Sequence, residues 1–413
     1  MRIRFLVAVV FSFVATSALN VVGQTTVLDN ATFFSAPFRV NDAVYDRTRG
    51  VVFATTPSSQ GDTLGNRLLE INPSDGTVLN STVVGSEPNK LAISSDGSRI
   101  YIGIDGDPGV RLFTPDTGTL GAIAPLSDRD GPAVAEDIAV SPGFPDSVVV
   151  SRGDGILEVF NVAGTMLTST FSQPLSGFRT NDNLIGFVNT NRLFTFNNSN
   201  SGSEGMLYDF DGQALTLDIS QPRVISSGNI EVETGSDGQI YFTNGLVLDS
   251  SDLLAEGTFN TGLEGPSAVV EPVPALGLTY FAGPATSQTG IVTLSVFDSE
   301  TFLLIDSVEV SGIRTGDAGG ELIAAGENRL VLITQERFFG FDSPRVMTFI
   351  SDIPVSMPIL GDVNQDGVAD FSDIPAFISV LQMGQFQAEA DINQDGEVNF
   401  ADVPAFIEIL VAA

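Results

Sequence analysis

The strongest constraint on the fold is a repeat of short apolar runs between about residues 40 and 350. Seven of these runs, most of them just after a turn sequence, recur about every 46 residues and begin at Val51, Ile100, Val148, Leu193, Ile240, Leu278 and Leu330. Each run is preceded by another apolar run and followed by a third, and a fourth often comes after a second turn. Four short strands per unit, with a period in the forties, are typical of the blades of a β-propeller. The sequence therefore predicts a mainly β fold, with about seven blades over residues 31–350.

The clearest unit consists of Pro88, the segment LAISSDGSRIYIG (residues 91–103) and the segment VRLFTPDTGTL (residues 110–120). This unit resembles the YVTN-type and lactonase-like repeats of seven-bladed β-propellers, and the resemblance extends over roughly 310 residues. The unit around Leu278 fits the repeat least well. We expect the ring to close with a strand from residues 32–38 or from residues 346–350. A β-sandwich, or two smaller all-β domains, is the alternative architecture.

The first residues have the pattern of a secretory signal peptide. Arg2 and Arg4 are followed by an apolar run over residues 5–14, which Ser12 alone interrupts, and then by small residues. A positive start, an apolar run and a cleavage site of small residues define such a peptide, so we expect a signal peptide within residues 1–23, with cleavage after Ser17, Ala18 or Gly23. An uncleaved anchor is the alternative, although the run is shorter than the ~20 residues of a membrane-spanning helix. The prediction is a secreted, extracellular or cell-surface protein with no transmembrane segment in the mature chain.

Three residue types are absent from the chain: histidine, cysteine and tryptophan. Their absence excludes Ser-His-Asp and Cys-His catalysis, metal sites with His or Cys ligands, and disulfides. The formal net charge is −33, from 18 basic and 51 acidic residues, and Lys90 is the only lysine. Because so acidic a surface repels nucleic-acid phosphates and anionic membranes, nucleic acid is not an expected partner.

Carboxylates are the remaining candidates for chemistry in the propeller. Six of them precede or lie in the expected inner strands, where they could converge on the central channel: Glu136, Asp137, Asp182, Glu231, Glu233 and Glu321. Two convergent carboxylates would allow glycoside hydrolysis. In a chain with 51 acidic residues, however, carboxylates at blade ends are expected from composition alone. The catalytic residues therefore stay unknown, and we favour a non-catalytic propeller that binds a ligand or a protein.

Residues 361–413 contain a duplicated loop followed by an apolar run. The two loops, DVNQDGVADFSD and DINQDGEVNFAD, begin at Asp362 and Asp391. Oxygen ligands at loop positions 1, 3, 5, 9 and 12, a backbone carbonyl at position 7 and glycine at position 6 are the pattern by which a loop surrounds Ca²⁺. The predicted ligands of two calcium ions are Asp362, Asn364, Asp366, Val368, Asp370, Asp373, Asp391, Asn393, Asp395, Glu397, Asn399 and Asp402. Two solvated turns are the alternative, and the duplication in one register argues against it.

The region contains a loop followed by a helix twice, with Asp at position 12 and no helix before either loop. This arrangement resembles the type I dockerin module. The resemblance covers residues 361–411 and implies that this region docks onto cohesin domains. It places the contacts at loop positions 10–11, which read Phe371-Ser372 and Phe400-Ala401 here, and along the helices. A hydroxyl pair is common at those positions in cellulosomal dockerins, so the apolar residues make a partner other than cohesin an alternative. Dockerins commonly accompany plant-polysaccharide hydrolases, which also suggests a carbohydrate-related role.

These patterns divide the chain into a signal peptide (residues 1–23), a β-propeller (31–350), a linker (351–360) and a small α-helical dockerin-like domain (361–413). They predict a secreted calcium-binding protein whose propeller, with a glycan or protein ligand, is attached to a cohesin-like or cell-surface partner. The alternative is an extracellular polysaccharide-active hydrolase or lyase, with the propeller as the catalytic domain and the dockerin-like domain as the anchor. A third hypothesis is a structural or envelope protein whose acidic surface gathers divalent cations nonspecifically.

Overall fold

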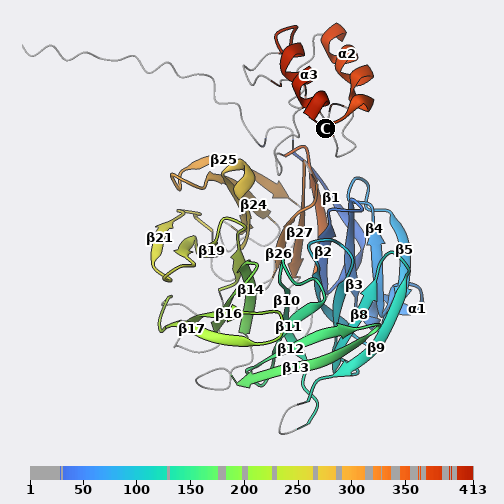
Figure 1. Ribbon diagram of the computed structural model, residues 1–413, viewed down its shortest axis with the longest axis vertical. Coiled ribbons are helices and arrows are strands. Elements are labelled where there is room, and N and C mark those ends of the chain that lie inside the picture. The colour runs from blue at the N-terminus through green and yellow to red at the C-terminus, as the bar shows by residue number, and fades with distance from the viewer. Residues whose placement is uncertain are drawn as a thin grey trace, which may run out of the picture.

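The structure is a computed structural model of the chain. It describes residues 28, 31–127, 131–174, 183–197, 203–225, 230–263, 268–284, 291–311, 320–326, 328–335, 345–353, 361, 363, 369–383, 390, 392 and 398–412. Within these ranges, twenty-eight strands form seven sheets of four strands each (Figure 1). The sheets are the blades of a seven-bladed β-propeller, which confirms the predicted fold class.

The first three blades follow one another along the chain, and each begins with its innermost strand. Blade 1 consists of β2 (Asp42–Asp46), β3 (Val51–Thr56), β4 (Arg67–Ile71) and β5 (Val78–Val83). Blade 2 consists of β6 (Pro88–Ile93), β7 (Ile100–Ile104), β8 (Gly109–Thr114) and β9 (Thr119–Pro125). Blade 3 consists of β10 (Ala135–Val140), β11 (Ser147–Arg152), β12 (Ile156–Ala163) and β13 (Met166–Pro174).

The next three blades are built in the same order. Blade 4 consists of β14 (Asn183–Asn189), β15 (Arg192–Asn197), β16 (Gly205–Phe210) and β17 (Leu215–Gln221). Blade 5 consists of β18 (Val232–Thr234), β19 (Gln239–Phe242), β20 (Leu246–Asp249) and β21 (Ala255–Thr258). Blade 6 consists of β22 (Val269–Val273), β23 (Leu278–Gly283), β24 (Ile291–Asp298) and β25 (Leu304–Ser311).

Blade 7 joins the two ends of the propeller sequence. Its strands, from the innermost outward, are β26 (Glu321–Ala324), β27 (Arg329–Gln335), β28 (Arg345–Ser351) and β1 (Thr32–Val40). β1 pairs antiparallel with β28, and the rings of Phe34 and Phe349 stack with their centroids 4.8 Å apart. The two segments predicted as alternatives for closing the ring therefore lie side by side in one blade.

The described helices are few and short. Those near the propeller are η1 (Ser58–Gln60), α1 (Gly61–Leu64) and η3 (Pro274–Leu276). Those of the C-terminal module, residues 361–413, are η4 (Phe371–Asp373), α2 (Ile374–Met383) and α3 (Val403–Ala412).

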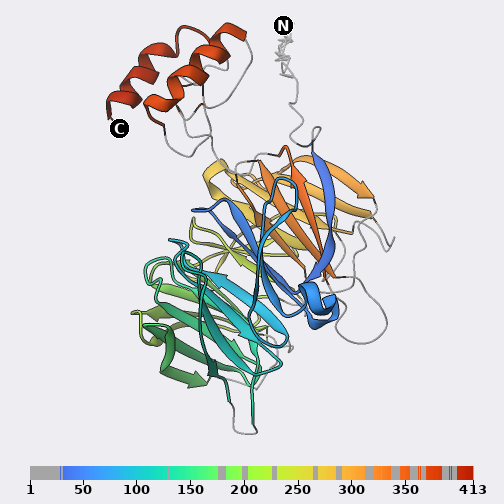
Figure 2. The ribbon, with the colours of Figure 1, turned by 90° about the vertical axis from the view of Figure 1, so that its right-hand side faces the viewer.

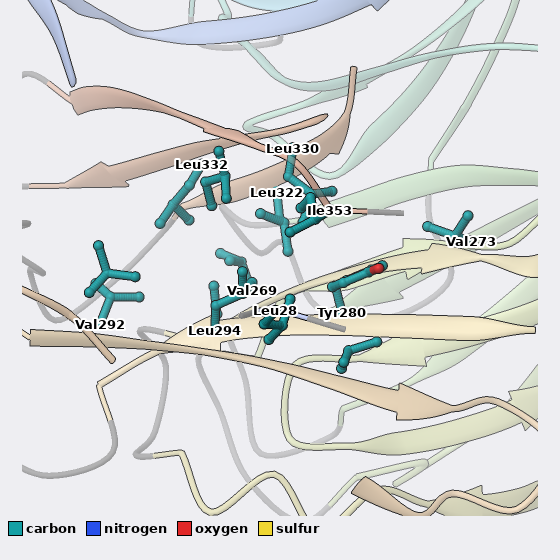
Figure 3. Close-up of a cluster of buried hydrophobic side chains, with 14 residues drawn as sticks. Leu28, Val269, Val273, Tyr280, Val292, Leu294, Leu322, Leu330, Leu332 and Ile353 are labelled. Atoms are coloured by element: carbon teal, nitrogen blue, oxygen red, sulfur yellow. The ribbon is translucent and has the colours of Figure 1, made fainter. Parts of the chain in front are cut away.

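The second strand of each blade carries one of the seven predicted apolar runs, including the weak unit at Leu278. These runs are continuous because a blade lies between two neighbours and buries both faces of its sheet. In β7, Ile100 and Ile102 pack against blade 1, whereas Tyr101 between them packs against blade 3. Figure 3 shows the equivalent interface between blades 6 and 7, where Tyr280 lies in one cluster with Leu322.

We expect the ring to depend on β1, because its side chains close the last interface. Phe38 is 4% exposed and belongs to the cluster that joins blade 7 to blade 1. Phe38→Ala should lower the free energy of unfolding by about 3–5 kcal/mol, since it removes a buried aromatic ring. The exposed Thr32, on the same strand, is the control, and Thr32→Ala should cost less than about 1 kcal/mol. Unfolding in urea can be followed by tyrosine fluorescence, because all five tyrosines lie in the propeller sequence. Equal stability of both variants would contradict closure by β1.

Candidate functional site

The C-terminal module is built from two helices at equivalent positions of the duplicated sequence. α2 and α3 lie side by side, and the rings of Phe377 and Phe406 have their centroids 4.3 Å apart (Figure 2). Pro375 and Pro404 fit the first turn of each helix, where the missing amide hydrogen has no intrahelical partner to lose. The other buried apolar side chains among the described residues of the module are Val363, Val380, Ala390, Ile392 and Leu410.

The ends of the two predicted calcium loops fold in the same way. In the first copy, Asp370 Oδ1 accepts a hydrogen bond from the Ser372 amide at 2.7 Å, and Asp373 Oδ2 accepts one from the Asp370 amide at 2.8 Å. In the second copy, Asn399 and Asp402 accept the equivalent bonds at 2.7 and 2.9 Å. Such a capping box satisfies free amides at a helix start. It also fixes the side chains of loop positions 9 and 12 just before each helix.

The side chains at position 12 of both loops are buried. Asp373 and Asp402 are 0% exposed, and residues 361–413 contain neither lysine nor arginine. Burying an ionised carboxylate is costly unless a cation compensates its charge. The hydrogen bonds from Ser372 hold the pKa of Asp370 below its ordinary value, which keeps this loop carboxyl ionised. The described loop residues therefore fit Ca²⁺, a hard cation that prefers oxygen ligands.

The other eight predicted ligands lie outside the described residues: Asp362, Asn364, Asp366, Val368, Asp391, Asn393, Asp395 and Glu397. Within the ranges that the structure describes, no group of three or more acidic side chains could hold a metal ion. The loop ends thus supply only part of each predicted ligand set.

Each copy of the module also exposes apolar side chains at equivalent positions. Phe371 and Phe400, at loop position 10, are 66% and 82% exposed. Ile378 and Ile407, seven positions further along, are exposed as well. Phe371 lies in η4 and Phe400 in a turn, so both precede the helices that carry Ile378 and Ile407. Each copy therefore exposes an aromatic side chain at the loop end and an isoleucine on the following helix, and this pair is called here its exposed apolar stripe.

A second candidate site lies in the propeller, where the innermost strands surround a cavity of about 750 Å³, here called the axial cavity. Five of the six predicted carboxylate residues line this cavity: Glu136, Asp137, Glu231, Glu233 and Glu321. The structure thus brings these five residues together. Asp182 lies outside the described residues. Other charged lining residues, which sequence reasoning missed, are Asp42, Lys90, Asp105 and Arg345.

Some of these carboxylates join neighbouring blades. Asp42 Oδ2 accepts a hydrogen bond from the Leu91 amide of the next blade at 2.8 Å, and Asp137 Oδ2 accepts one from Ile185 at 2.8 Å. Glu271 Oε1, near the cavity, accepts one from the Ala324 amide at 3.0 Å. Each bond runs from one innermost strand to the next, so these three carboxylates have a structural role at the ring axis.

Lys90 is the counter-charge on one side of the axial cavity. Burial alone would lower its pKa, but the charges of Asp42, Asp137 and Glu231 outweigh burial and the opposing charge of Arg345. The pKa of Lys90 therefore lies above its ordinary value, and its side chain stays an ammonium. Lys90 stands out in the sequence as the only lysine. The acidic residues around it come from strands that are distant along the chain, so the sequence alone does not predict these contacts.

Burial raises the pKa of the carboxyl groups around the cavity. Burial raises the pKa of Asp137 to about 6, although the charge of Lys90 opposes this rise. Burial also raises the pKa of Glu233 to about 7, and the charge of Asp137 adds to the rise. The pKa values of Glu271 and Glu321 also lie well above the ordinary value, mainly because both groups are buried. The charge of Glu233 adds to the rise for Glu271, and the charge of Asp42 adds to it for Glu321. Glu233 is therefore protonated in part near neutral pH, and the other three carboxyl groups keep their protons to a higher pH than they would in water.

Comparison with known proteins identifies the C-terminal module. Residues 360–410 match the family model of the dockerin type I domain. Dockerin type I domains bind Ca²⁺ and cohesin, and they occur in secreted or cell-surface proteins. The chain is thus a seven-bladed β-propeller followed by a dockerin-type module. No curated protein matches the sequence.

Solved structures share the propeller fold. The structure of U3-55K is 12% identical, with a TM-score of 0.54, and the match covers 77% of this chain and 98% of that one. The Cps50 (Swd1) β-propeller domain of Myceliophteria thermophila is 11% identical, with a TM-score of 0.56 and coverage of 78% and 100%. At such low identity the similarity shows the fold alone. Among the described residues, no helix has the length and apolar character that crossing a membrane requires.

The raised pKa values predict that the propeller loses stability as the pH rises. An unfolded glutamate titrates near pH 4.3, whereas the pKa of Glu233 in the fold is about 7, so the folded state binds more protons between these values. The contribution of Glu233 to stability should be largest below about pH 4 and should fall by about 2 kcal/mol or more as the pH rises through 7. Asp137, Glu271 and Glu321 act in the same direction.

Urea unfolding at several pH values, followed by tyrosine fluorescence, measures this effect. Glu233→Gln should flatten the dependence, because glutamine does not titrate, and Glu300→Gln, at an exposed turn, should leave it unchanged. A propeller that becomes more stable between pH 4 and 7 would contradict the prediction.

Proposed function

We propose that this is a secreted calcium-binding protein in which a non-catalytic propeller is attached to a cohesin-like partner through its dockerin-type module. The signal-peptide pattern of residues 1–23 supports secretion. The module match over residues 360–410 supports the attachment. The propeller then presents its binding surfaces, for a glycan or a protein, at the place where the partner holds it.

The observation that carries this proposal is the pair of fully buried carboxylates, Asp373 and Asp402, in a module without basic residues. We assign one calcium ion to each loop, which makes two ions per chain. The ligands would be the twelve residues predicted from the sequence, with Asp370 and Asn399 at position 9. Calcium binding would offset the repulsion among the carboxylates of each loop, so that docking requires the ion.

The docking contact would use the exposed apolar stripes. The dockerin resemblance places contacts at loop positions 10–11, and position 10 is Phe371 in one copy and Phe400 in the other. Exposed aromatic side chains are common energetic centres of protein interfaces. We therefore expect the partner to offer an apolar pocket for phenylalanine in place of a hydrogen-bonding surface for hydroxyl groups.

Binding of the full chain to a panel of immobilised cohesin domains, in calcium and in chelator, tests the proposal. We expect binding in calcium alone, and none for the variant that combines Asp362→Ala with Asp391→Ala. Phe371→Ser with Phe400→Ser should weaken binding about 100-fold, as for two aromatic anchors, while calcium uptake is kept. Leu79→Ser with Leu303→Ser is the control, because both leucines are exposed outside the module. Binding that survives chelator, or an unaffected double phenylalanine variant, would contradict the proposed docking.

The axial cavity supports a second candidate, a polysaccharide-active hydrolase or lyase. Glu233, with a pKa of about 7, would be protonated in part at neutral pH and able to act as a general acid, and Asp137 lies close enough to influence it. If so, the full chain should cleave one member of a polysaccharide panel, and Glu233→Gln should abolish the activity while Glu300→Gln retains it. No turnover on any polysaccharide would reject this candidate.

A further inference from the structure

The hairpins between the third and fourth strands of blades 5 and 6 share their backbone geometry with the hairpin of blade 1. In blade 1, the Gly76 amide donates to the Asn72 carbonyl at 2.8 Å, and Gly76 has a φ of 67°. Leu253 and Phe302 occupy this position in blades 5 and 6, with φ values of 59° and 58° and equivalent hydrogen bonds of 2.9 Å. Because the left-handed region favours glycine, a large apolar residue at each position is strained, and its surroundings must offset the cost.

Each of these two turns sends successive side chains in different directions. The first side chain packs inward: Leu253 is 1% exposed, and the rings of Phe302 and Phe259 have their centroids 4.9 Å apart. The second side chain stays outside the core, since Leu254 and Leu303 are 57% and 66% exposed. Burial of the first side chain offsets the strain of the turn. The exposed leucines, by contrast, contribute little to the packing of the propeller.

The two hairpins lie next to each other at the outer rim of the propeller. The Phe302 ring covers Gly257 in β21, where a side-chain carbon would lie only 2.3 Å from the ring. β21 begins directly after Leu254, and Figure 1 shows β21 and β25 as outer strands of their blades. The exposed leucines of both hairpins therefore gather in one area, here called the rim patch: Leu254, Leu303 and Leu304. A contiguous exposed apolar area marks an interaction site, whereas scattered single leucines do not.

Acidic residues without basic neighbours in the sequence surround the rim patch. Residues 232–311, which form blades 5 and 6, contain eleven acidic residues and neither lysine nor arginine. Glu256 and Glu300 are exposed on the two hairpins. Hydrogen bonds from backbone amides hold the pKa values of Asp249 and Asp298 below the ordinary value, which keeps both carboxyl groups ionised. The surface around the leucines is therefore strongly negative.

We propose that the rim patch is a docking site for an amphipathic basic segment of another protein. The apolar side chains of that segment would cover the leucines, and its lysine or arginine side chains would face the surrounding carboxylates. Complementary charge steers association and excludes partners of like charge. A second copy of this chain, with a formal net charge of −33, would be repelled. This inference rests on the proposed role of the propeller as a binding domain, but not on docking by the module.

Titration calorimetry of the full chain with a short peptide of alternating leucine and lysine tests the inference. A peptide of alternating serine and lysine controls for charge, and one of alternating leucine and glutamate controls for apolar contact. We expect the leucine–lysine peptide to bind at least tenfold more tightly than either control, and added salt to weaken its binding. Leu254→Ser with Leu303→Ser should weaken it about 10- to 100-fold, since two leucines are no longer buried. Leu79→Ser is the matched control, because Leu79 is 56% exposed on blade 1.

A second variant tests the contribution of charge. Glu256→Gln with Glu300→Gln should weaken binding of the leucine–lysine peptide about threefold to tenfold and make it less sensitive to salt. The substituted side chains are all exposed, so the variants should fold. Tyrosine fluorescence checks this directly, because Tyr241 and Tyr280 lie in blades 5 and 6.

Equal binding of the serine–lysine peptide or an unaffected double leucine variant would each overturn the inference. Dimerisation of the full chain that the double leucine variant abolishes would also overturn it, since the rim patch would then belong to a second copy. The variant Phe371→Ser with Phe400→Ser separates this site from module docking, because it should lose the cohesin contact and keep the peptide. Loss of peptide binding in that variant would contradict the assignment to the rim patch.

Discussion

The structure depends on the burial of both faces of every blade. A four-stranded sheet with two apolar faces is stable only between two neighbours, so the ring must close on itself. Blade 7 closes the ring, because β1 from the start of the propeller sequence pairs there with β28 from its end. The same closure brings Asp42 of blade 1 against Glu321 of blade 7. The apolar interfaces between the blades therefore form the acidic cavity at the axis, although the charged residues that line the cavity do not belong to these interfaces.

Negative charge has to be compensated in two places, and the chain does so differently in each. At the propeller axis, backbone amides of the next blade and the single ammonium of Lys90 face the carboxylates, and the remaining groups keep protons through raised pKa values. The C-terminal module has no basic side chain at all, and its Asp373 and Asp402 are fully buried. Proposed calcium ions would supply the missing charge there, which would couple the fold of the module to the metal.

The fold was predictable because its signals are local. A strand buried on both faces is a continuous apolar run, so Val51, Ile100 and the other run starts located all seven second strands, and the duplicated loop located the module. The cavity was predictable only in part. Glu233 and Glu321 were named from their place before or in inner strands, but Asp42, Lys90 and Glu271 were missed as partners. The innermost strands, which carry these residues, are short and partly polar. Their side chains come together only when the ring closes, so no local sequence pattern predicts the contacts between them.

We propose that each loop of the module binds one calcium ion and that the ion orders the loop–helix unit. Calorimetric titration of the metal-free full chain with calcium, with circular dichroism recorded in parallel, tests this proposal. We expect sharp saturation at two ions per chain, with a gain of helical signal and no change in tyrosine fluorescence, because the tyrosines lie outside the module. Gradual uptake without saturation at two ions, or uptake that leaves the helical signal unchanged, would contradict it and favour nonspecific binding to the acidic surface.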